Sequence, residues 1–316
     1  MGKRGNINSS SLPLGLDRVT IGYSEPTGPT TAKPRPPGQR SPFLMIFAGG
    51  TPGELIPLKP PRQTVGRGEG CAIRFDDEAL SPSHAVLDFD SQGRLRVIDS
   101  RSSSGVLVNG VRLLPLQPKP LRSGDRLQLG GVVLKYVELD QLEEQAHRQQ
   151  FRLTISDPLT GMHNRRHFVE QFPGFAERCR SRRQGVILLM IDLDRFKALN
   201  DQLGHLAGDA ALRLVASVLG RLLRPEDLAA RYGGEEFIIA RSAASISEGV
   251  ALADKIRQGL AAQPFRADEA EWPLSASVGV AFSRWNQPWN GEALIRLADD
   301  CLNTAKRMGR DRVVSE

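Results

Sequence analysis

The chain has 316 residues, of which 40% are hydrophobic and 25% are charged, and its formal net charge is +6. This length gives room for about two domains with ordinary cores, which excludes a disordered chain. The longest apolar run, residues 185–191, is too short to cross a bilayer, and no apolar segment follows the first charged residues as in a signal peptide. We therefore expect a cytoplasmic protein without membrane insertion.

Residues 1–42 are rich in Pro, Gly, Ser and Thr and show no hydrophobic period. This composition predicts an extended, disordered tail. The first 41 residues hold six basic and two acidic side chains, a balance of +4 that accounts for most of the net charge. The basic excess therefore belongs mainly to a solvated tail, and we expect no nucleic-acid partner.

Short apolar runs with a period near two fill residues 43–138, as in 85–89, 95–98 and 132–137. Turn-forming clusters such as residues 91–93 separate these runs. Many short strands at this spacing predict an all-β sandwich of about 95 residues.

The next segment, residues 139–153, predicts a helical linker. Leu139, Leu142, Ala146 and Leu153 fall on a rough heptad stripe among polar residues. Two heptads are too few to define a coiled coil, so a rigid spacer and a seam between two subunits both stay open.

Helical and strand patterns alternate over residues 154–316, which predicts an α/β domain with helices packed on a sheet. The expected helices include residues 207–223, 246–260 and 291–306, and the expected strands include residues 186–192, 237–240 and 274–282.

The most informative motif is residues 231–237, with the sequence RYGGEEF. Gly233 and Gly234 favour a tight turn before an apolar strand, which places Glu235 and Glu236 at the tip of a hairpin. Adjacent carboxylates are hard oxygen ligands for a divalent cation. This arrangement suits phosphate chemistry.

Further polar residues surround this motif in the sequence. Asp192 and Asp194 follow a buried-strand pattern, at a strand end that a ligand can reach. Asn200 and Asp209 flank a glycine-containing turn, where they could bind the polar edge of a base.

Each signal alone has a simpler explanation. The glycines could form an ordinary hairpin turn, and Asp192 and Asp194 could cap a helix. Lys306 and Arg310 have the spacing of two cations on successive helical turns, which is also typical of a solvated helix face. The order and spacing of the motifs carry more weight than any one of them.

Taken together, these motifs resemble the GGDEF family of diguanylate cyclases over essentially all of residues 154–316. Residues 157–166, DPLTGMHNRR, are similar to the motif that opens the family's domain, residues 192–197 to its DxDxFK strand end, and residues 233–237 to its signature. The resemblance implies an α/β (α+β) domain of the palm or nucleotide-cyclase type. It also implies an enzyme that condenses two GTP molecules into cyclic di-GMP and pyrophosphate.

The resemblance assigns the metal and the catalytic acids. It implies that Mg²⁺, or Mn²⁺, is bound by Asp192, Glu235 and the carbonyl of Leu193. Glu235 or Glu236 would help to activate the attacking ribose hydroxyl, and the sequence does not separate their roles. Such a reaction needs a deprotonated nucleophile and neutralisation of the leaving pyrophosphate.

The substrate contacts follow from the same resemblance. Asn200 and Asp209 match the guanine-binding positions, where a mismatched base would leave buried polar groups unpaired. Lys197, Lys306 and Arg310 match the cations that hold the phosphates. If one domain binds one GTP, a two-fold symmetric product requires two domains, so we expect an active homodimer.

Arg224 and Asp227 form an RxxD motif seven residues before Arg231. By resemblance, this motif is the family's inhibitory site for the product, cyclic di-GMP. Arginine stacks on guanine and forks onto phosphate, and aspartate accepts guanine N–H groups. The alternative is a surface ion pair in a loop.

Residues 43–138 resemble a forkhead-associated (FHA) domain, a β-sandwich that reads phosphothreonine. The resemblance rests on residues 66–67, 81–84 and 99–110. It implies that Arg67 and Ser81 contact the phosphate of a phosphothreonine-containing partner protein.

Some positions in these loops depart from the family pattern. Ser104 stands where the family usually has asparagine, beside Ser103, and Pro82 follows Ser81. A serine hydroxyl cannot grip a peptide backbone with the two-ended amide of asparagine. His84 is expected to brace the loops rather than to bind the ligand. A sandwich kept only for docking or dimerisation stays open.

The sequence therefore leaves several functions to compare. The first is a diguanylate cyclase regulated by its FHA domain and by product inhibition. The others are a catalytically silent cyclic di-GMP receptor, a phosphoprotein-docking scaffold and a cyclase with another base preference. The filled catalytic positions favour the first.

Overall fold

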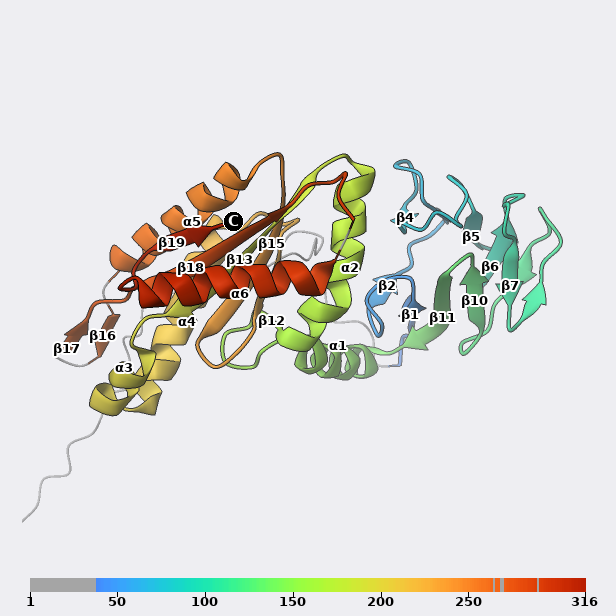
Figure 1. Cartoon of the computed structure of the whole chain (residues 1–316). Coiled ribbons are helices and arrows are strands. Elements are labelled where there is room, and N and C mark those ends of the chain that lie inside the picture. Colours follow the sequence, from blue (N-terminus) through green and yellow to red (C-terminus); the bar gives the residue numbers. More distant parts are fainter. Residues whose placement is uncertain (1–37, 264, 268–269, 289) are drawn as a thin grey trace, which may run out of the picture. The chain divides into compact units, whose positions relative to one another are not determined.

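The computed structural model describes residues 38–316 except 264, 268–269 and 289 (Figure 1). The chain divides into two compact units, with the boundary between Ser156 and Asp157. Residues 1–37, which hold most of the predicted tail, lie outside the described residues. Among the helices of the described part, none is long and apolar enough to cross a membrane.

The amino-terminal unit is the predicted all-β sandwich. One sheet has the order β2-β1-β11-β10-β7-β8 and the other β4-β3-β5-β6-β9. The strands are β1 (Ser41–Ala48), β2 (Leu55–Pro57), β3 (Arg62–Gly66), β4 (Ile73–Arg74), β5 (Ala85–Phe89), β6 (Leu95–Asp99), β7 (Val106–Val108), β8 (Val111–Arg112), β9 (Lys119–Pro120), β10 (Arg126–Leu129) and β11 (Val132–Leu139). The sandwich begins at Ser41, inside the stretch predicted as tail.

Alternation along the strands builds the core of the sandwich. Leu95 and Val97 of β6 and Leu127 and Leu129 of β10 are buried in one apolar cluster, while the residues between them are more exposed. Successive side chains of a strand point to opposite faces, so each sheet turns one apolar face inward.

The linker forms helix α1 (Gln141–Ile155). Asp140 caps its amino terminus: the Asp140 carboxylate accepts from the backbone N–H of Glu143, and the Glu143 carboxylate accepts from the N–H of Asp140. This reciprocal capping box starts the helix after Leu139, which closes β11. The predicted boundary at residue 139 is therefore shifted.

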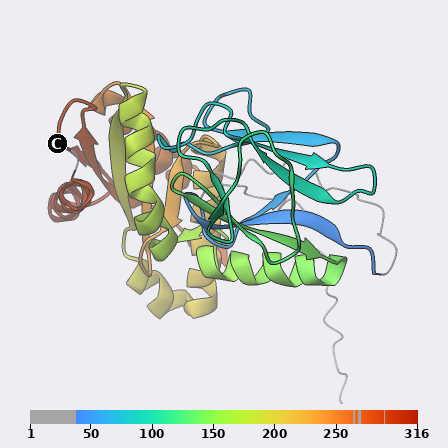
Figure 2. The same ribbon diagram turned by 90° about the vertical axis from the view of Figure 1, so that its right-hand side faces the viewer.

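Helix α1 is fastened to the sandwich within the same unit (Figure 2). His147 Nε2 donates to the carbonyl of Gly53 at 2.7 Å. The Arg148 guanidinium lies 5.9 Å from the centre of the Phe43 ring, in cation–π geometry. The linker is therefore attached along part of its length and is not a free spacer.

The predicted heptad stripe stays on the outside of this helix. Leu142 and Leu153 are 78% and 66% exposed, and Ala146 is also exposed. Leu139, the first residue of the predicted stripe, instead ends β11 and packs against a buried cluster of the sandwich, so only three of the four predicted residues share this exposed face.

The carboxy-terminal unit is the predicted α/β domain, built on a sheet of order β12-β14-β15-β13-β18-β19. Strands β16 and β17 form a two-stranded sheet of their own. The elements are β12 (His163–Asn164), α2 (Arg165–Ser181), β13 (Gly185–Leu193), α3 (Phe196–Leu203), α4 (His205–Leu222), β14 (Leu228–Arg231), β15 (Glu236–Ala243), α5 (Ile246–Ala261), β16 (Phe265–Ala267), β17 (Ala270–Trp272), β18 (Ala276–Ser283), α6 (Gly291–Arg307) and β19 (Val313–Ser315).

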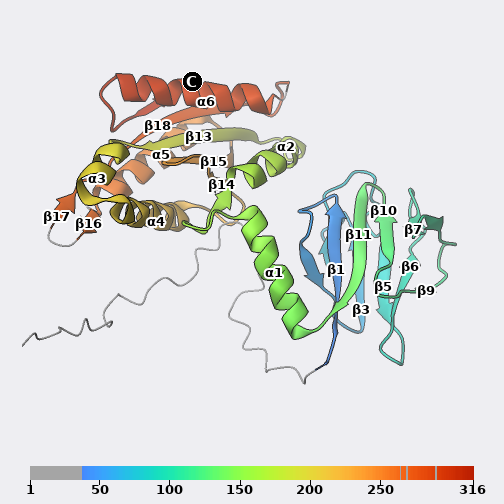
Figure 3. The same ribbon diagram turned by 90° about the horizontal axis from the view of Figure 1, so that it is seen from below.

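Helices cover both faces of this sheet (Figure 3). Strand β13 is buried along its whole length. Its residues Ile187 and Leu189 join the cluster formed with α4 and α5, whereas Val186 and Leu188 join the cluster formed with α2 and α6. A strand covered on both faces reads as a continuous apolar run, which is the pattern seen in the sequence.

Helix α6 packs directly against β18 at Gly279. A Cβ at this position would lie 2.0 Å from the carbonyl oxygen of Ala298 and 2.3 Å from the backbone nitrogen of Leu302. Only glycine allows this approach of helix and strand.

Candidate active site

The glycine turn joins β14 to β15 as an antiparallel hairpin, as predicted. The carbonyl of Glu236 accepts from the N–H of Tyr232 at 2.7 Å and from that of Gly233 at 3.2 Å. A Cβ at Gly233 would lie 2.3 Å from Oε2 of Glu236, so a side chain there would displace the Glu236 carboxylate from this position. Glu235 and Glu236 are consequently held at the start of β15.

Arg231 braces this turn, a role that the sequence alone did not reveal. Its Nη2 donates to the carbonyl of Gly234 at 2.6 Å, and its Nη1 lies 3.1 Å from Oδ2 of Asp157. The backbone N–H and the hydroxyl of Thr160 also donate to Asp157. The motif at residues 157–166 thereby holds the acidic turn through one ion pair.

Removing this brace should destabilise the domain. Burial alone would raise the pKa of Asp157, but the hydrogen bonds from Thr160 and Arg231 outweigh it and lower the pKa. The stabilisation is therefore present above about pH 4 and is lost as the pH falls through the lowered pKa. We expect Arg231→Met and Asp157→Asn to be non-additive in denaturant unfolding at pH 7, with a coupling of roughly 0.5–3 kcal/mol. Additive effects would contradict the brace.

Asp192 faces the acidic turn from the neighbouring strand. It ends the register in which β13 pairs with β15, opposite Glu236. Lys306 Nζ of α6 lies 2.7 Å from Asp192 Oδ2. Burial raises the pKa of Asp192, with Glu236 and Asp194 adding to the rise and Lys306 opposing it. Burial and the nearby Asp192 likewise raise the pKa of Glu235.

Asp194 has a different role from Asp192. Its carboxylate accepts from the hydroxyls of Ser275 at 2.9 Å and Ser277 at 2.7 Å, and from the backbone N–H of Asp311 at 3.0 Å. It does not cap α3, whose N-cap residue is Arg195. Asp194 therefore fixes the end of β13 to the segments around it.

The two cations near the carboxyl end do not lie on successive turns of one helix. Helix α6 ends at Arg307, and Gly309 follows with a φ of 110°. This positive φ turns the chain away from the helix, so Arg310 lies in the following loop and is exposed. Lys306 reaches Asp192, whereas Arg310 forms no ion pair with the acids of the site among the described residues.

The predicted guanine site lies where α3 meets α4. Oδ1 of Asn200 is buried and has no hydrogen-bond partner among the described residues. A Cβ at Gly208, next to Asp209, would come within 1.9 Å of this oxygen, so a larger residue there would displace the Asn200 amide. Asn200 thus has an unused buried acceptor, while Lys197 on the first turn of α3 is exposed.

The acids fit a divalent cation. No group of three or more His, Cys, Asp or Glu side chains suited to a metal occurs in the part of the chain that the structure describes. Mg²⁺, however, is commonly held by one or two carboxylates together with substrate phosphates. Burial is the main cause of the raised pKa values of Asp192 and Glu235, and neighbouring carboxylates add to both. The Lys306 ammonium, 2.7 Å from Asp192 Oδ2, shows that a cation is favoured at this position.

Asp227 of the RxxD motif is enclosed, whereas Arg224 is exposed. The Asp227 side chain has no exposed surface and forms an ion pair with Arg241 of β15. The expected product-binding pair is therefore only half accessible in this conformation, because a buried carboxylate bonded to arginine cannot accept from guanine.

The predicted phosphate-binding residues of the sandwich lie in adjoining loops. The hydroxyl oxygen of Ser81 accepts from the backbone N–H of Ser103 at 3.0 Å, and the backbone N–H of Arg67 donates to the backbone carbonyl of Ser81. The hydroxyl of Ser104 donates to Ala79 O at 2.9 Å, so in this conformation it is bonded within the loops.

His84 is fully buried and braces these loops, as expected. Its Nδ1 accepts from the N–H of Ser81, and its Nε2 donates to the carbonyl of Gly105. Both ring nitrogens are used, which leaves neither for a ligand.

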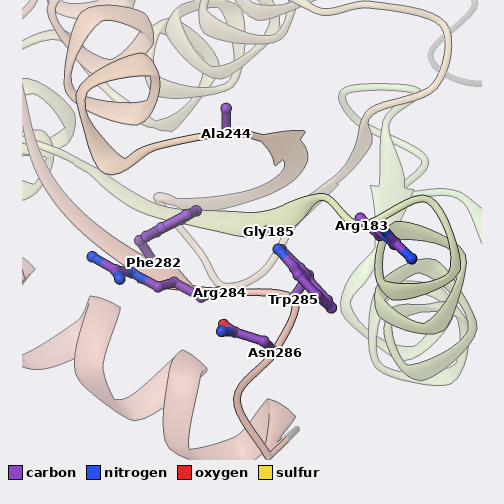
Figure 4. A pocket seen from close by; sticks show the side chains of 7 residues that line it. All are labelled: Arg183, Gly185, Ala244, Phe282, Arg284, Trp285 and Asn286. Atoms are coloured by element: carbon purple, nitrogen blue, oxygen red, sulfur yellow. The ribbon is translucent and has the colours of Figure 1, made fainter.

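A pocket of about 370 Å³ lies at the opposite end of β13 from Asp192 (Figure 4). Arg183, Arg284 and Trp285 are among its lining residues, and none of the predicted site residues lines it. This pocket is therefore separate from the acidic site.

The fold and the site define a chain in which a β-sandwich precedes an α/β domain with acids and a lysine gathered at strand ends. Residues 154–312 match the family description "Diguanylate cyclase, GGDEF domain", and residues 63–130 match the FHA domain. The chain belongs to the GGDEF family of diguanylate cyclases and carries an FHA domain in its amino-terminal unit.

Similar proteins include the diguanylate cyclase DgcP of Pseudomonas aeruginosa, 39% identical over 52% of this chain and 24% of DgcP. The response regulator PleD of Caulobacter vibrioides is 29% identical over 86% of this chain and 58% of PleD. The chain thus matches less than two thirds of the length of either relative. A crystal structure of the coiled coil and GGDEF domain of DgcB from Caulobacter crescentus, in complex with c-di-GMP, aligns with a TM-score of 0.51 at 28% identity, over 55% of this chain and 91% of that one.

Proposed function

We propose that the chain is a cytoplasmic diguanylate cyclase that condenses two GTP molecules into cyclic di-GMP and pyrophosphate. The observation that carries this proposal is the meeting of Asp192, Lys306 and the Glu235–Glu236 turn at neighbouring strand ends. Membership of the GGDEF family supports the same activity.

In this proposal, Asp192, Glu235 and the Leu193 carbonyl hold Mg²⁺ or Mn²⁺. The ion would supply charge neutralisation at the phosphates and lower the pKa of the attacking hydroxyl. Glu235 or Glu236 receives the proton of the ribose 3′-hydroxyl as the 3′-oxygen attacks the α-phosphorus of the second GTP. The bond from this phosphorus to the α,β-bridging oxygen breaks, and pyrophosphate leaves.

Other side chains of the domain bind and orient the substrate. The free Oδ1 of Asn200 accepts from the guanine edge, and Asp209 is the second acceptor beside it. Lys197, Lys306 and Arg310 hold the triphosphate. Lys306 would be free to do so once a divalent cation is held by Asp192, since both cations would compete for the same carboxylate.

A homodimer is part of the proposal. Each domain supplies one GTP and half of the contacts, so two chains must face each other across a two-fold axis to form both phosphodiester bonds.

Incubation of the purified chain with GTP and Mg²⁺ tests the activity, with the products separated by chromatography and identified by mass. Cyclic di-GMP is the expected product, and ATP in place of GTP should give none. If no product forms, even from chains joined through a fused leucine zipper, the remaining functions are the catalytically silent cyclic di-GMP receptor and the phosphoprotein-docking scaffold. Product from ATP would indicate a cyclase with another base preference.

We further propose that the FHA unit docks a phosphothreonine-containing protein through Arg67, Ser81, Ser103 and Ser104. The adjoining positions of the two serine loops support this, because hydroxyls and a guanidinium together suit a phosphate.

The Arg67→Ala variant should lose phosphothreonine-peptide binding by at least about tenfold, since one charge-assisted hydrogen bond to a phosphate is worth roughly 1.5–3 kcal/mol. Fluorescence anisotropy with a library of labelled phosphothreonine peptides measures it. The matched control is Arg122→Ala, another exposed arginine of the sandwich outside these loops. Retained binding in Arg67→Ala would exclude this site.

Product inhibition at Arg224 and Asp227 completes the proposal. We expect Arg224→Ala to raise the amount of cyclic di-GMP formed at late times while leaving the initial rate unchanged, because only the inhibited state is lost. Full progress curves measured by chromatography check this, and a curve that matches the unsubstituted chain would refute inhibition through Arg224.

A further inference from the structure

The carboxylate of Asp227 is already fully used inside the domain. Nε of Arg241 donates to both of its oxygens at 3.0 Å, and Nη2 of Arg241 donates to Oδ2 as well. The backbone N–H of Arg224 donates to the same Oδ2 at 2.8 Å. No exposed surface is left on the Asp227 side chain.

Arg241 is an unusual residue for its place in the sheet. It lies on β15, where Phe237 and Ile239 on the same face join the apolar core, and it pairs in register with the buried Ile187. Charged side chains are almost never buried unless they are paired. Arg241 also donates from Nη2 to the carbonyl of Leu222, the last residue of α4, at 3.1 Å. One guanidinium therefore ties the strand, the helix end and the loop together.

The two halves of the RxxD motif consequently differ. Arg224 is exposed, and its guanidinium forms no ion pair within the described residues. The Arg224 guanidinium can therefore stack on a base without any change in the conformation of this loop. Asp227 can accept from a ligand only after its bonds to Arg241 break, which leaves the arginine buried without a partner.

We propose that the ion pair between Arg241 and Asp227 holds residues 224–227 in a closed conformation and sets how strongly cyclic di-GMP binds there. We call this ion pair the lock: it is closed when the pair is formed and open when the pair is broken. This inference rests on the proposed product site. With the lock closed, ligand binds through Arg224 alone. With the lock open, Asp227 turns outward and accepts from the guanine as well. A binding-competent state that is only fractionally populated weakens the apparent affinity by that fraction.

Calorimetric titration of the full chain with cyclic di-GMP, without GTP or metal, tests the lock. Arg241→Met puts an apolar side chain of similar length at this position and removes the guanidinium that competes with the ligand for the Asp227 carboxylate. The Kd of this variant for cyclic di-GMP should therefore be at least about tenfold lower than that of the unsubstituted chain. Without its partner, the Asp227 carboxylate is driven out to solvent. Arg224→Ala in the same background should abolish the gain, which shows that the ligand uses the same loop.

The decisive comparison is a double-mutant cycle with Asp227→Asn. The lock predicts that Asp227→Asn changes Kd by less than about threefold when Arg241 is present and weakens binding by at least about tenfold in the Arg241→Met chain. Equal effects in the two backgrounds would overturn it, and so would an unchanged Kd in Arg241→Met. If Arg241→Met does not fold, Arg241→Lys takes its place: a lysine cannot fork onto the carboxylate, so Kd should still fall, and an unchanged Kd overturns the lock.

Synthesis is measured separately on the same preparations. A chain that makes cyclic di-GMP but whose Arg241→Met variant does not bind it overturns the lock and the product site and leaves the cyclase intact. A chain that binds cyclic di-GMP more tightly after Arg241→Met but makes none supports the lock and overturns the enzyme.

Discussion

Replacing Glu235 by alanine should abolish cyclic di-GMP synthesis while leaving the fold intact. Glu235 is the proposed metal ligand of the acidic turn, and loss of one group that stabilises transition-state charge lowers rates by on the order of 10²–10³-fold. Burial and the neighbouring carboxylates raise the pKa of Glu235. An acid whose pKa is raised by folding destabilises the folded state at neutral pH, so its removal should leave the melting temperature unchanged or higher.

Product formation and thermal unfolding of the same preparation check this result. The matched control is Glu177→Ala, an exposed glutamate on α2 far along the chain from the turn, which should keep full activity. If Glu235→Ala retains more than a tenth of the rate, another group holds the metal and the proposed ligand set is wrong.

Replacing Gly279 by alanine should have the largest effect on stability. Its Cβ would lie 2.0 Å and 2.3 Å from backbone atoms of α6, which cannot turn away as a side chain can. Apolar contacts need about 3.5–4.0 Å, so helix and strand must separate. Overpacking of this kind costs about 3 kcal/mol, which corresponds to a melting temperature lower by roughly 6–12 °C. Because Lys306 lies further along α6, synthesis should fall as well.

Calorimetry compares this variant with Gly174→Ala. Gly174 lies within α2, and a Cβ at that position would lie 3.5 Å from Nη1 of Arg178, an ordinary contact with a flexible side chain. Alanine there should raise stability by about 0.5–1 kcal/mol, because glycine is a poor helix former. A Gly279→Ala chain as stable as this control would show that α6 can shift at little cost.

The sequence predicted the elements whose patterns are locally complete. The run of apolar residues in β13 and the glycines before β15 define their structures without help from the rest of the chain. The expected helices named above do not include α2, whose middle holds Pro173 and Gly174, two residues that disfavour helix. Its amphipathic packing against the sheet overrides these two residues.

The site was predictable in part. Asp192 and the acidic turn followed from motifs, but the ion pair between Asp192 and Lys306 joins residues far apart in the sequence, and only the folded sheet brings them together. The same holds for Arg231 and Asp157. The ion pair between Arg241 and Asp227 could have been predicted from the sequence. An arginine among the apolar residues of a buried strand needs a buried partner, and Asp227 lies just before the preceding strand.

The fastening of α1 to the sandwich gives the linker a fixed helical phase. The contacts at His147 and Arg148 determine which side of the helix carries the exposed Leu142. Each residue of an α-helix advances its direction by about 100°. These contacts therefore fix the rotation of α1 about its own axis relative to the sandwich, so the directions in which Leu142 and Leu153 face are set together with the position of the helix.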